Sequence, residues 1–335
     1  MTEKGVAMEP QKFQDTFKRI DAEIRKVIVG HDDAIRKVLI AFFAGGHVLL
    51  EGVPGLGKTL LVKAFSAAIG MSFKRIQFTP DLMPSDIVGT EVLAENGGRR
   101  EFQFKKGPVF AHVVLADEIN RATPKTQSAV LEAMEEKQVT VFGESHLLES
   151  PFMVMATQNP IELEGTYPLP EAQLDRFFFK LLVTSPTQAE LREILKRTTG
   201  TESGEANRVL PEDGGRHIND MKQLLRQVLI APPIEDYVVR LVHGTQPAAQ
   251  NGTVAPASVK NYLRFGASPR GAQSIILGAK GNALAEGRVH VSYEDVEKVL
   301  YPALRHRIIL NFQAEAESVS ADQIIAEVVK QVPRT

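Results

Sequence analysis

One segment of the sequence has the residue types and the spacing that bind phosphate groups. Residues 52–59 read Gly-Val-Pro-Gly-Leu-Gly-Lys-Thr and match G-x-x-x-x-G-K-[ST] at every fixed position. The glycines let backbone N–H groups turn toward one point, and the helix expected after them adds its positive end. In such a loop Lys58 reaches the β- and γ-phosphates and the Thr59 hydroxyl binds Mg²⁺. The residues expected to line this nucleotide site are Gly52, Pro54, Gly55, Leu56, Gly57, Lys58, Thr59 and Leu60.

Two adjacent acids follow one of the most apolar short runs of the chain. Residues 113–116 read Val-Val-Leu-Ala, which is typical of a buried parallel strand, and Asp117 and Glu118 come directly after them. Carboxylates at the end of a buried strand are unfavourable unless they have partners or a function. Asp117 is suited to hold a metal ion, and Glu118 is suited to polarise an attacking water. The pair indicates a hydrolase, although a simple capped strand end stays open.

A third candidate segment is the polar run that follows an apolar strand predicted over 152–156. Residues 157–160 read Thr-Gln-Asn-Pro. If Asn159 lies beside Asp117, its amide would orient a water molecule or contact the γ-phosphate. Asn-Pro by itself is a common turn signal, so the residues alone leave both interpretations open.

Short strands and helices alternate over the first half of the chain. Strands are expected at 47–51, 73–78, 113–116, 152–156 and 177–183. Helices are expected as a pair within 12–44 that bends at Gly30, over 60–69, and from Thr123-Pro124 to about Glu136. The alternation predicts the α/β class, with a parallel sheet that helices cover on both faces.

Two hairpins interrupt this alternation, and a helical region follows it. The hairpins are expected at about 87–104, with an Asn-Gly turn signal, and at 139–148. Helices are expected at 188–198, 218–229, 234–243, 272–285, 293–307 and 321–329, with loops at 199–215 and 246–256. Ser292 and Asp295 have the spacing of a capping box. We therefore expect a nucleotide-binding domain over 1–185 and a helical domain over 186–335.

The composition excludes several classes of function. The chain has no cysteine, which excludes disulfide scaffolds, thiol catalysis and cysteine-ligated metal centres. Its 39 Lys and Arg against 41 Asp and Glu give a net charge of −2, so it has no global field for a polyanion, and no nucleic-acid partner is expected. No apolar run approaches the ~18 residues that span a bilayer, and the first residues lack the apolar core of a signal peptide. We expect a cytoplasmic protein without direct membrane insertion.

The order of these segments resembles that of the AAA+ ATPases. The phosphate loop at 52–59, the strand ending in Asp117-Glu118 and the run Ala-Thr-Gln-Asn-Pro at 156–160 occur in the order of that superfamily. Residues 165–177, Gly-Thr-Tyr-Pro-Leu-Pro-Glu-Ala-Gln-Leu-Asp-Arg-Phe, resemble its MoxR branch, as do Gly-Ala-Ser-Pro-Arg at 266–270 and Leu-Arg-His-Arg at 304–307. The resemblance covers residues 12–330. It implies a P-loop AAA+ core with a five-stranded parallel sheet flanked by helices, followed by a smaller all-α lid.

The resemblance also implies roles for individual residues. Asn159 would be the first sensor, and Arg176 would be the arginine finger that reaches the γ-phosphate bound to a neighbouring subunit. Arg270 would be the second sensor, brought from the lid onto the nucleotide. Val29 and Gly30 would line the adenine pocket, and the hairpin at 87–104 would be the insert of the helix-2-insert clade. The expected catalytic residues are Lys58, Glu118, Asn159, Arg176 and Arg270, and the expected metal ligands are Thr59 and Asp117.

These roles imply an ATP hydrolase that uses ATP, ADP and Mg²⁺ and works as a ring of six copies of itself. MoxR relatives resemble chaperones that act with von Willebrand factor A domain proteins in maturation of, or cofactor insertion into, client proteins. Two other classes stay open, a nucleic-acid motor or loader and the motor subunit of a metal chelatase. The ATPase rate with and without DNA at a stated salt concentration tests the first. A coupled assay with a chelatase partner and a porphyrin tests the second.

Overall fold

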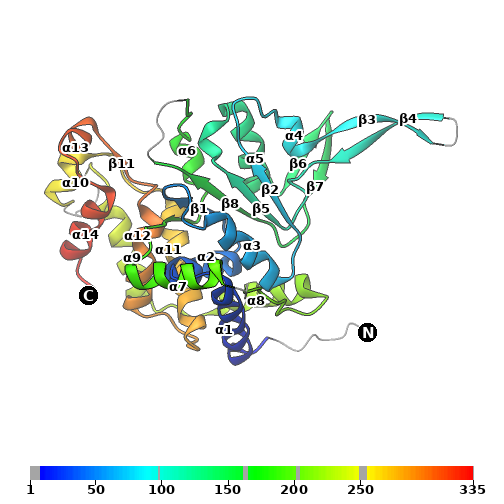
Figure 1. Cartoon of the computed structure of the whole chain (residues 1–335). Helices are drawn as coiled ribbons and strands as arrows, with labels where there is room; N and C mark the ends of the chain where they lie inside the picture. Colours follow the sequence, from blue (N-terminus) through cyan, green and yellow to red (C-terminus); the bar gives the residue numbers. More distant parts are fainter. Residues whose placement is uncertain (1–7, 97–98, 161–164, 201–203, 249–254, 335) are drawn as a thin grey trace, which may run out of the picture.

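The centre of the protein is a five-stranded parallel sheet (Figure 1). The computed structural model describes residues 8–96, 99–160, 165–200, 204–248 and 255–334. The strand order is β2-β5-β8-β1-β9. The strands are β1 (Val48–Glu51), β2 (Phe73–Gln77), β5 (Val113–Asp117), β8 (Met153–Gln158) and β9 (Phe179–Leu182). The predicted α/β class and parallel sheet are confirmed, and each strand lies within a few residues of its expected position.

Helices cover both faces of the sheet, as its continuously apolar strands require. In β5, Val113 and Leu115 join one buried cluster, whereas Val114 and Ala116 join another on the opposite face. This division follows from the two-residue period of a strand. The first face carries α1 (Pro10–Val27), α2 (Asp32–Ala44) and α3 (Lys58–Ile69), and the second carries α4 (Pro84–Val88) and α5 (Pro124–Glu136).

A mostly helical region follows the sheet. Its elements are α7 (Gln188–Thr199), α8 (Gly214–Gln227), α9 (Pro232–Gly244), α10 (Ala257–Tyr262), β10 (Leu263–Phe265), α11 (Pro269–Ala285), α12 (Tyr293–Leu304), β11 (Ile309–Leu310), α13 (Phe312–Ala316) and α14 (Ala321–Gln331). The paired strands β10 and β11 are an addition to the expected all-α lid. Within the described ranges, no helix combines the length and the apolar character needed to cross a bilayer.

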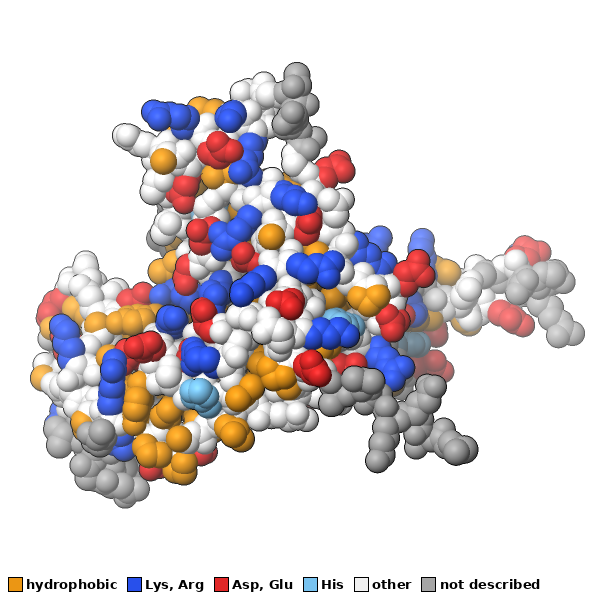
Figure 2. Space-filling model, turned by 90° about the horizontal axis from the view of Figure 1, so that it is seen from below, with side chains coloured by type: hydrophobic (Ala, Val, Ile, Leu, Met, Phe, Trp, Pro, Cys, Tyr) orange, Lys and Arg blue, Asp and Glu red, His pale blue; other side chains and the backbone are white. Residues whose placement is uncertain are grey.

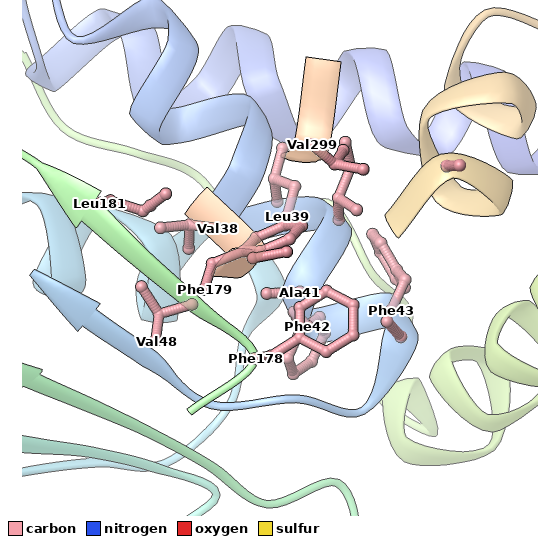
Figure 3. Packing of buried hydrophobic residues seen from close by; sticks show 14 of the residues in the cluster. Val38, Leu39, Ala41, Phe42, Phe43, Val48, Phe178, Phe179, Leu181 and Val299 are labelled. Carbon is pink, nitrogen blue, oxygen red and sulfur yellow. The ribbon is translucent and has the colours of Figure 1, made fainter. Parts of the chain in front are cut away.

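The helical region and the sheet share one apolar core. Phe42 and Phe43 of α2 pack close to Phe178 and Phe179 at the start of β9, and Val299 of α12 joins the same cluster (Figure 3). Because α1 contacts both α3 and α11, and α2 contacts both β9 and α11, these two helices lie between the sheet and the lid helices. The lid is therefore packed against the core through a broad apolar contact. The division of the chain at residue 185 stays a prediction.

Two antiparallel hairpins extend from the α/β part. The first is β3 (Gly89–Asn96) with β4 (Arg99–Lys106), and it projects away from the body of the molecule (Figure 1). The second is β6 (Gln138–Val141) with β7 (Glu144–Leu147), close to the predicted position. Phe104 of the first stacks on His146 of the second, with ring centroids 4.0 Å apart. The predicted Asn-Gly turn falls partly on residues 97–98, which lie outside the described ranges.

Local capping signals had mixed outcomes. The capping box at the start of α12 is confirmed, since the Asp295 carboxylate accepts from the Ser292 N–H at 2.9 Å and the Ser292 hydroxyl accepts from the Asp295 N–H at 3.4 Å. Thr123 precedes α5 as predicted, but its hydroxyl pairs with the Thr126 hydroxyl instead of capping a backbone N–H. The short helices α4 and α6 (Glu171–Leu174) lie in segments where no apolar periodicity predicts them.

A buried histidine links the start of β1 to two neighbouring elements. The ring of His47 is 6% exposed. Its Nδ1 accepts from the Val154 N–H at 2.9 Å, and its Nε2 lies 3.2 Å from the Met134 carbonyl oxygen. A neutral ring with its proton on Nε2 satisfies both partners. Burial is the main cause that lowers the pKa of His47 to about 4, and the charges of Lys222 and Lys137 act in the same direction.

We expect acid to destabilise the fold through His47. The unfolded imidazole titrates near 6.5, whereas the folded ring stays neutral down to about pH 4. Its contribution is therefore complete above pH 6.5 and is lost as the pH falls from 6.5 toward 4, to a total of about 3 kcal/mol. His47→Gln should reduce the slope of unfolding free energy against pH in this window by about one proton. Urea unfolding at constant ionic strength measures it.

The matched control is the exposed His290, replaced by Gln. Burial also lowers the pKa of His306 well below its usual range, so some acid dependence persists in the His47 variant. Equal slopes for wild type and His47→Gln would contradict the assignment.

Candidate active site

The phosphate loop joins β1 to α3 with the backbone that its sequence requires. A Cβ on Gly52 would lie 2.5 Å from the carbonyl oxygen of Val183, so only glycine fits beside the end of β9. Gly57 has φ +77° and caps α3, and no atom lies within 4 Å of a Cβ built there. The space in front of the loop is therefore open, and the first turn of α3 follows with its unpaired N–H groups.

The side chains predicted from three separate segments meet at one cavity. The cavity has a volume of about 370 Å³ and lies at the carboxyl ends of the parallel strands. It is lined by Pro54, Gly55, Leu56, Gly57, Lys58, Thr59, Leu60, Arg75, Asp117, Glu118, Thr157 and Asn159. Asn159 is 5% exposed and follows β8, so a polar group at that strand tip faces the cavity.

Asp117 is the buried carboxylate of this cavity. Its side chain accepts a hydrogen bond from the Thr157 hydroxyl at 2.6 Å, and the Thr59 hydroxyl lies 3.4 Å from the other carboxylate oxygen. A carboxylate and a hydroxyl side by side, with room for phosphate oxygens and water, fit the few protein ligands that Mg²⁺ takes. Among the described residues, no group of three or more acids or histidines is arranged to hold a metal ion by itself. This donor set therefore fits a metal that is shared with a bound phosphate.

Glu118 is held beside the cavity in a strained backbone conformation. Its φ is +56°, in the left-handed region, and its N–H donates to the Thr157 hydroxyl at 2.8 Å. Its carboxylate accepts from the Gln77 amide at 2.9 Å and pairs with Arg121 at 3.3 Å. Strain at a non-glycine residue is typical of functional positions. One hydroxyl, that of Thr157, thus positions both adjacent acids.

Arg75 and Gln77 are site residues that the sequence analysis missed. Arg75 donates to the Asp117 carboxylate at 2.9 Å, and Gln77 lies opposite Asp117 in the strand register. Both come from β2, which pairs with β5 although the two are 35 residues apart. The alternating pattern of β2 places the polar residues Arg75 and Gln77 on the same side of the strand. Their part in the site depends on the strand order, which the spacing does not give.

Lys58 lies across its own loop. Its ammonium donates to the carbonyl oxygen of Gly52 and to that of Val53, the latter at 3.2 Å. Burial lowers the pKa of Lys58, while Asp117, Glu118 and Glu51 oppose that shift. The lysine is therefore poised at the phosphate position, with backbone carbonyls as its partners.

A second cavity adjoins the first and has a more apolar lining. Its volume is about 210 Å³, and it shares Gly55, Leu56, Gly57 and Leu60 with the phosphate cavity. Val29, Pro186 and Ile194 contribute apolar surface that suits a flat base. Gly30 lies outside it and lines a neighbouring cavity together with Val29 and Glu190.

Arg176 and Arg270 lie together at the opposite end of the sheet. Arg176 pairs with one oxygen of Glu135 at 2.7 Å, and Arg270 pairs with the other at 2.6 Å. The Phe178 N–H donates to the His47 carbonyl oxygen, just before β1, whereas Gly52 follows β1. The two arginines and the phosphate loop are therefore separated by the length of β1. At 3.3 Å per residue, this length from His47 to Gly52 is about 16 Å.

The placement of Arg270 differs from the expectation of contact with the chain's own nucleotide. Ser268, at the start of α11, donates to both carboxylate oxygens of Asp175 at 2.9 Å. This bond anchors the helix start beside Arg176, and Arg270 is absent from the phosphate cavity.

A phosphate loop between β1 and α3, acids at the end of β5 and a polar tip on β8 define a P-loop nucleoside triphosphatase fold. The family model of the ATPases associated with various cellular activities matches residues 47–179, and that of the AAA lid domain matches residues 256–328. The chain belongs to the MoxR family of AAA+ ATPases.

Individual relatives agree along nearly the whole chain. Chaperone MoxR1 of Mycobacterium tuberculosis is 44% identical over 95% of this chain and 82% of its own. Protein MoxR of Methylorubrum extorquens is 32% identical over 96% of this chain and 95% of its own. A crystal structure from Cytophaga hutchinsonii superposes with a TM-score of 0.87 and 40% identity, covering 97% of this chain and 96% of that one.

Removing the Thr157 hydroxyl should loosen both acids. Thr157→Val keeps the shape of this 1%-exposed side chain but leaves the Glu118 N–H and one Asp117 oxygen without a partner. We expect unfolding free energy to fall by about 1–3 kcal/mol and turnover to decrease. Urea unfolding and steady-state ATP hydrolysis measure the two effects. Thr157→Ser keeps the hydroxyl and should behave like wild type, and a fully stable and active Val variant would contradict the role.

Proposed function

We propose that the protein binds and hydrolyses MgATP to ADP and phosphate. The observation that carries the proposal is the single cavity in which the phosphate loop, Asp117, Glu118 and Asn159 meet. The adjoining apolar cavity would take the adenine, with Val29 against the base. Thr59 and Asp117 would hold Mg²⁺, which when bound neutralises charge on the β- and γ-phosphate oxygens.

The protein groups would then divide the reaction. Lys58 leaves its carbonyl partners and binds the β- and γ-phosphates, and Asn159 contacts the γ-phosphate or the attacking water. Glu118 accepts a proton from that water while the oxygen of the water bonds to the γ-phosphorus. The bond from the γ-phosphorus to the bridging oxygen breaks, and its electrons remain on ADP. The Gln77 amide donates a hydrogen bond to the Glu118 carboxylate and orients it before the substrate binds.

The arginines would act on the nucleotide of a neighbouring copy. The span of β1 keeps Arg176 and Arg270 away from the chain's own phosphate loop, and both lie at the other end of the sheet, where they share the Glu135 carboxylate. A guanidinium against the γ-phosphate stabilises the transition state. Two different surfaces of the same chain then meet. Such a heterologous contact generates a ring when its rotation closes. A ring of six follows the family resemblance.

The biological role that we propose is that of a chaperone-like remodeller in the cytoplasm. The name of the Mycobacterium tuberculosis relative, Chaperone MoxR1, supports this role. The broad apolar contact between lid and core gives a route for nucleotide-dependent movement to reach a client. A von Willebrand factor A domain protein is the partner that we expect from the family resemblance.

Replacing the proposed base tests the chemistry directly. Glu118→Gln keeps the size and removes the proton acceptor, so kcat should fall by at least about 100-fold. ATP affinity, measured by calorimetry, should stay close to that of wild type. The matched control is Glu136→Gln, an exposed acid at the end of α5. Near-normal turnover in the Glu118 variant would remove the base assignment.

Mixing two inactive variants tests the arginine in trans. Arg176→Ala alone should lose about a thousandfold or more in hydrolysis, and Lys58→Ala should not bind nucleotide productively. A mixture should regain activity, because Lys58→Ala subunits supply an intact Arg176 to subunits with an intact loop. The control mixture uses the Lys58→Ala/Arg176→Ala double variant and should stay inactive. Failure of the first mixture to regain activity would contradict the trans role.

A further inference from the structure

A cleft at the amino ends of β1 and β9 carries more positive charge than two arginines account for. Its volume is about 380 Å³, and it lies between the α/β part and the lid. Besides Arg176 and Arg270, its lining includes Lys137 from the end of α5, Arg226 from α8 and Arg307 after α12. The acids in the lining are Glu135 and Asp175.

The existing ion pairs leave this cleft with an excess of cations. Asp175 is used by the buried Arg307, which donates to it at 2.8 Å. The single carboxylate of Glu135 is shared by Arg176 and Arg270. Lys137 and Arg226 have no ion pair with any acid in the described part of the chain. The lining is therefore short of negative charge.

A third cation beside the cleft shows the same shortage. The ammonium of Lys222 lies 5.3 Å from the centroid of the Phe42 ring and has no carboxylate partner among the described residues. Burial, followed by the charges of Lys137 and Arg226, lowers the pKa of Lys222 to about 8. Three like charges thus gather at the end of α5 and on α8, and none of them has an ion pair among the described residues, so an added anion would reduce their repulsion.

We propose that this cleft is a phosphate-binding site in which Lys137 and Arg226 bind the phosphate oxygens together with Arg176 and Arg270. Guanidinium forks and lysine ammonium groups are the donors that proteins use for phosphate. A phosphate group has more oxygens and more charge than the one carboxylate that the two arginines share. Two sources carry this chemistry: free phosphate, and the nucleotide of a neighbouring copy. Only the second source, the nucleotide of a neighbouring copy, rests on the proposed function.

The first arm of the test measures the cleft without hydrolysis. The full chain carrying Lys58→Ala, whose own phosphate loop is disabled, is titrated with pyrophosphate by calorimetry. Adding Lys137→Gln and Arg226→Gln should weaken binding by about tenfold or more. Lys125→Gln with Arg216→Gln, exposed positions on the same two helices and absent from the cleft lining, is the matched control and should leave affinity unchanged. The charge-conserving pair Lys137→Arg and Arg226→Lys should keep it.

The second arm measures the trans contact in the chain with an intact loop. If the phosphate comes from a neighbouring nucleotide, Lys137→Gln/Arg226→Gln lowers the ATPase rate, and added Lys58→Ala subunits restore it. If the two substitutions weaken pyrophosphate binding in the first arm but leave the ATPase rate of the second arm at the wild-type value, free phosphate is the ligand.

The outcomes separate the two proposals. Unchanged pyrophosphate affinity in the first arm together with a wild-type rate in the second overturns the phosphate site. An inactive wild-type chain, or an Arg176→Ala variant with full activity, overturns the proposed function and leaves the pyrophosphate titration as the decisive test of the cleft.

Discussion

The buried guanidinium of Arg307 connects the lid to the segment before β9 that carries the proposed arginine finger. Arg307 is 6% exposed and donates to the Asp175 carboxylate at 2.8 Å. It also donates to the carbonyl oxygens of Asp175 at 3.0 Å, Phe177 at 2.6 Å and Phe178 at 3.2 Å. Burial lowers its pKa to about 10 and Asp175 opposes that shift, so the group stays charged at neutral pH. A buried charge with this many partners fixes the backbone around Arg176.

The two residues before Arg307 bind the same segment and the start of β9. The Nε2 of His306 lies 2.9 Å from the Phe177 carbonyl oxygen, and Arg305 donates to the Lys180 carbonyl oxygen at 3.2 Å. With Ser268 on Asp175, the lid therefore holds this segment from the ends of two helices. Any movement of α11 or α12 relative to the sheet must displace Arg176 or break these bonds. Under the proposed trans role of Arg176, this would link the lid position in one subunit to catalysis in the next.

The sequence predicted features that depend on neighbouring residues and missed those that depend on packing. The phosphate loop and the acids after β5 were visible because each lies within a few consecutive residues. Their meeting could also be expected, since parallel strands bring their carboxyl ends to one edge. Arg75 and Gln77 were missed because their role requires β2 to lie beside β5, a pairing set by the topology. The expectation that Arg270 contacts the nucleotide came from the family resemblance, and nothing in its segment reveals that Ser268 binds Asp175.

The sheet acts as a spacer that makes the proposed site incomplete in a single copy. Its carboxyl edge carries the loop and the acids, and its amino edge carries Arg176 with the surplus cations of the cleft. The Lys180 ammonium pairs with Glu51 at 2.8 Å and holds the neighbouring strands β9 and β1 side by side. Because a bound triphosphate would add negative charge at the carboxyl ends of the strands, where the proposed contact brings the cations of a neighbouring cleft, nucleotide binding would strengthen that contact. Assembly and hydrolysis would then depend on the same phosphate group.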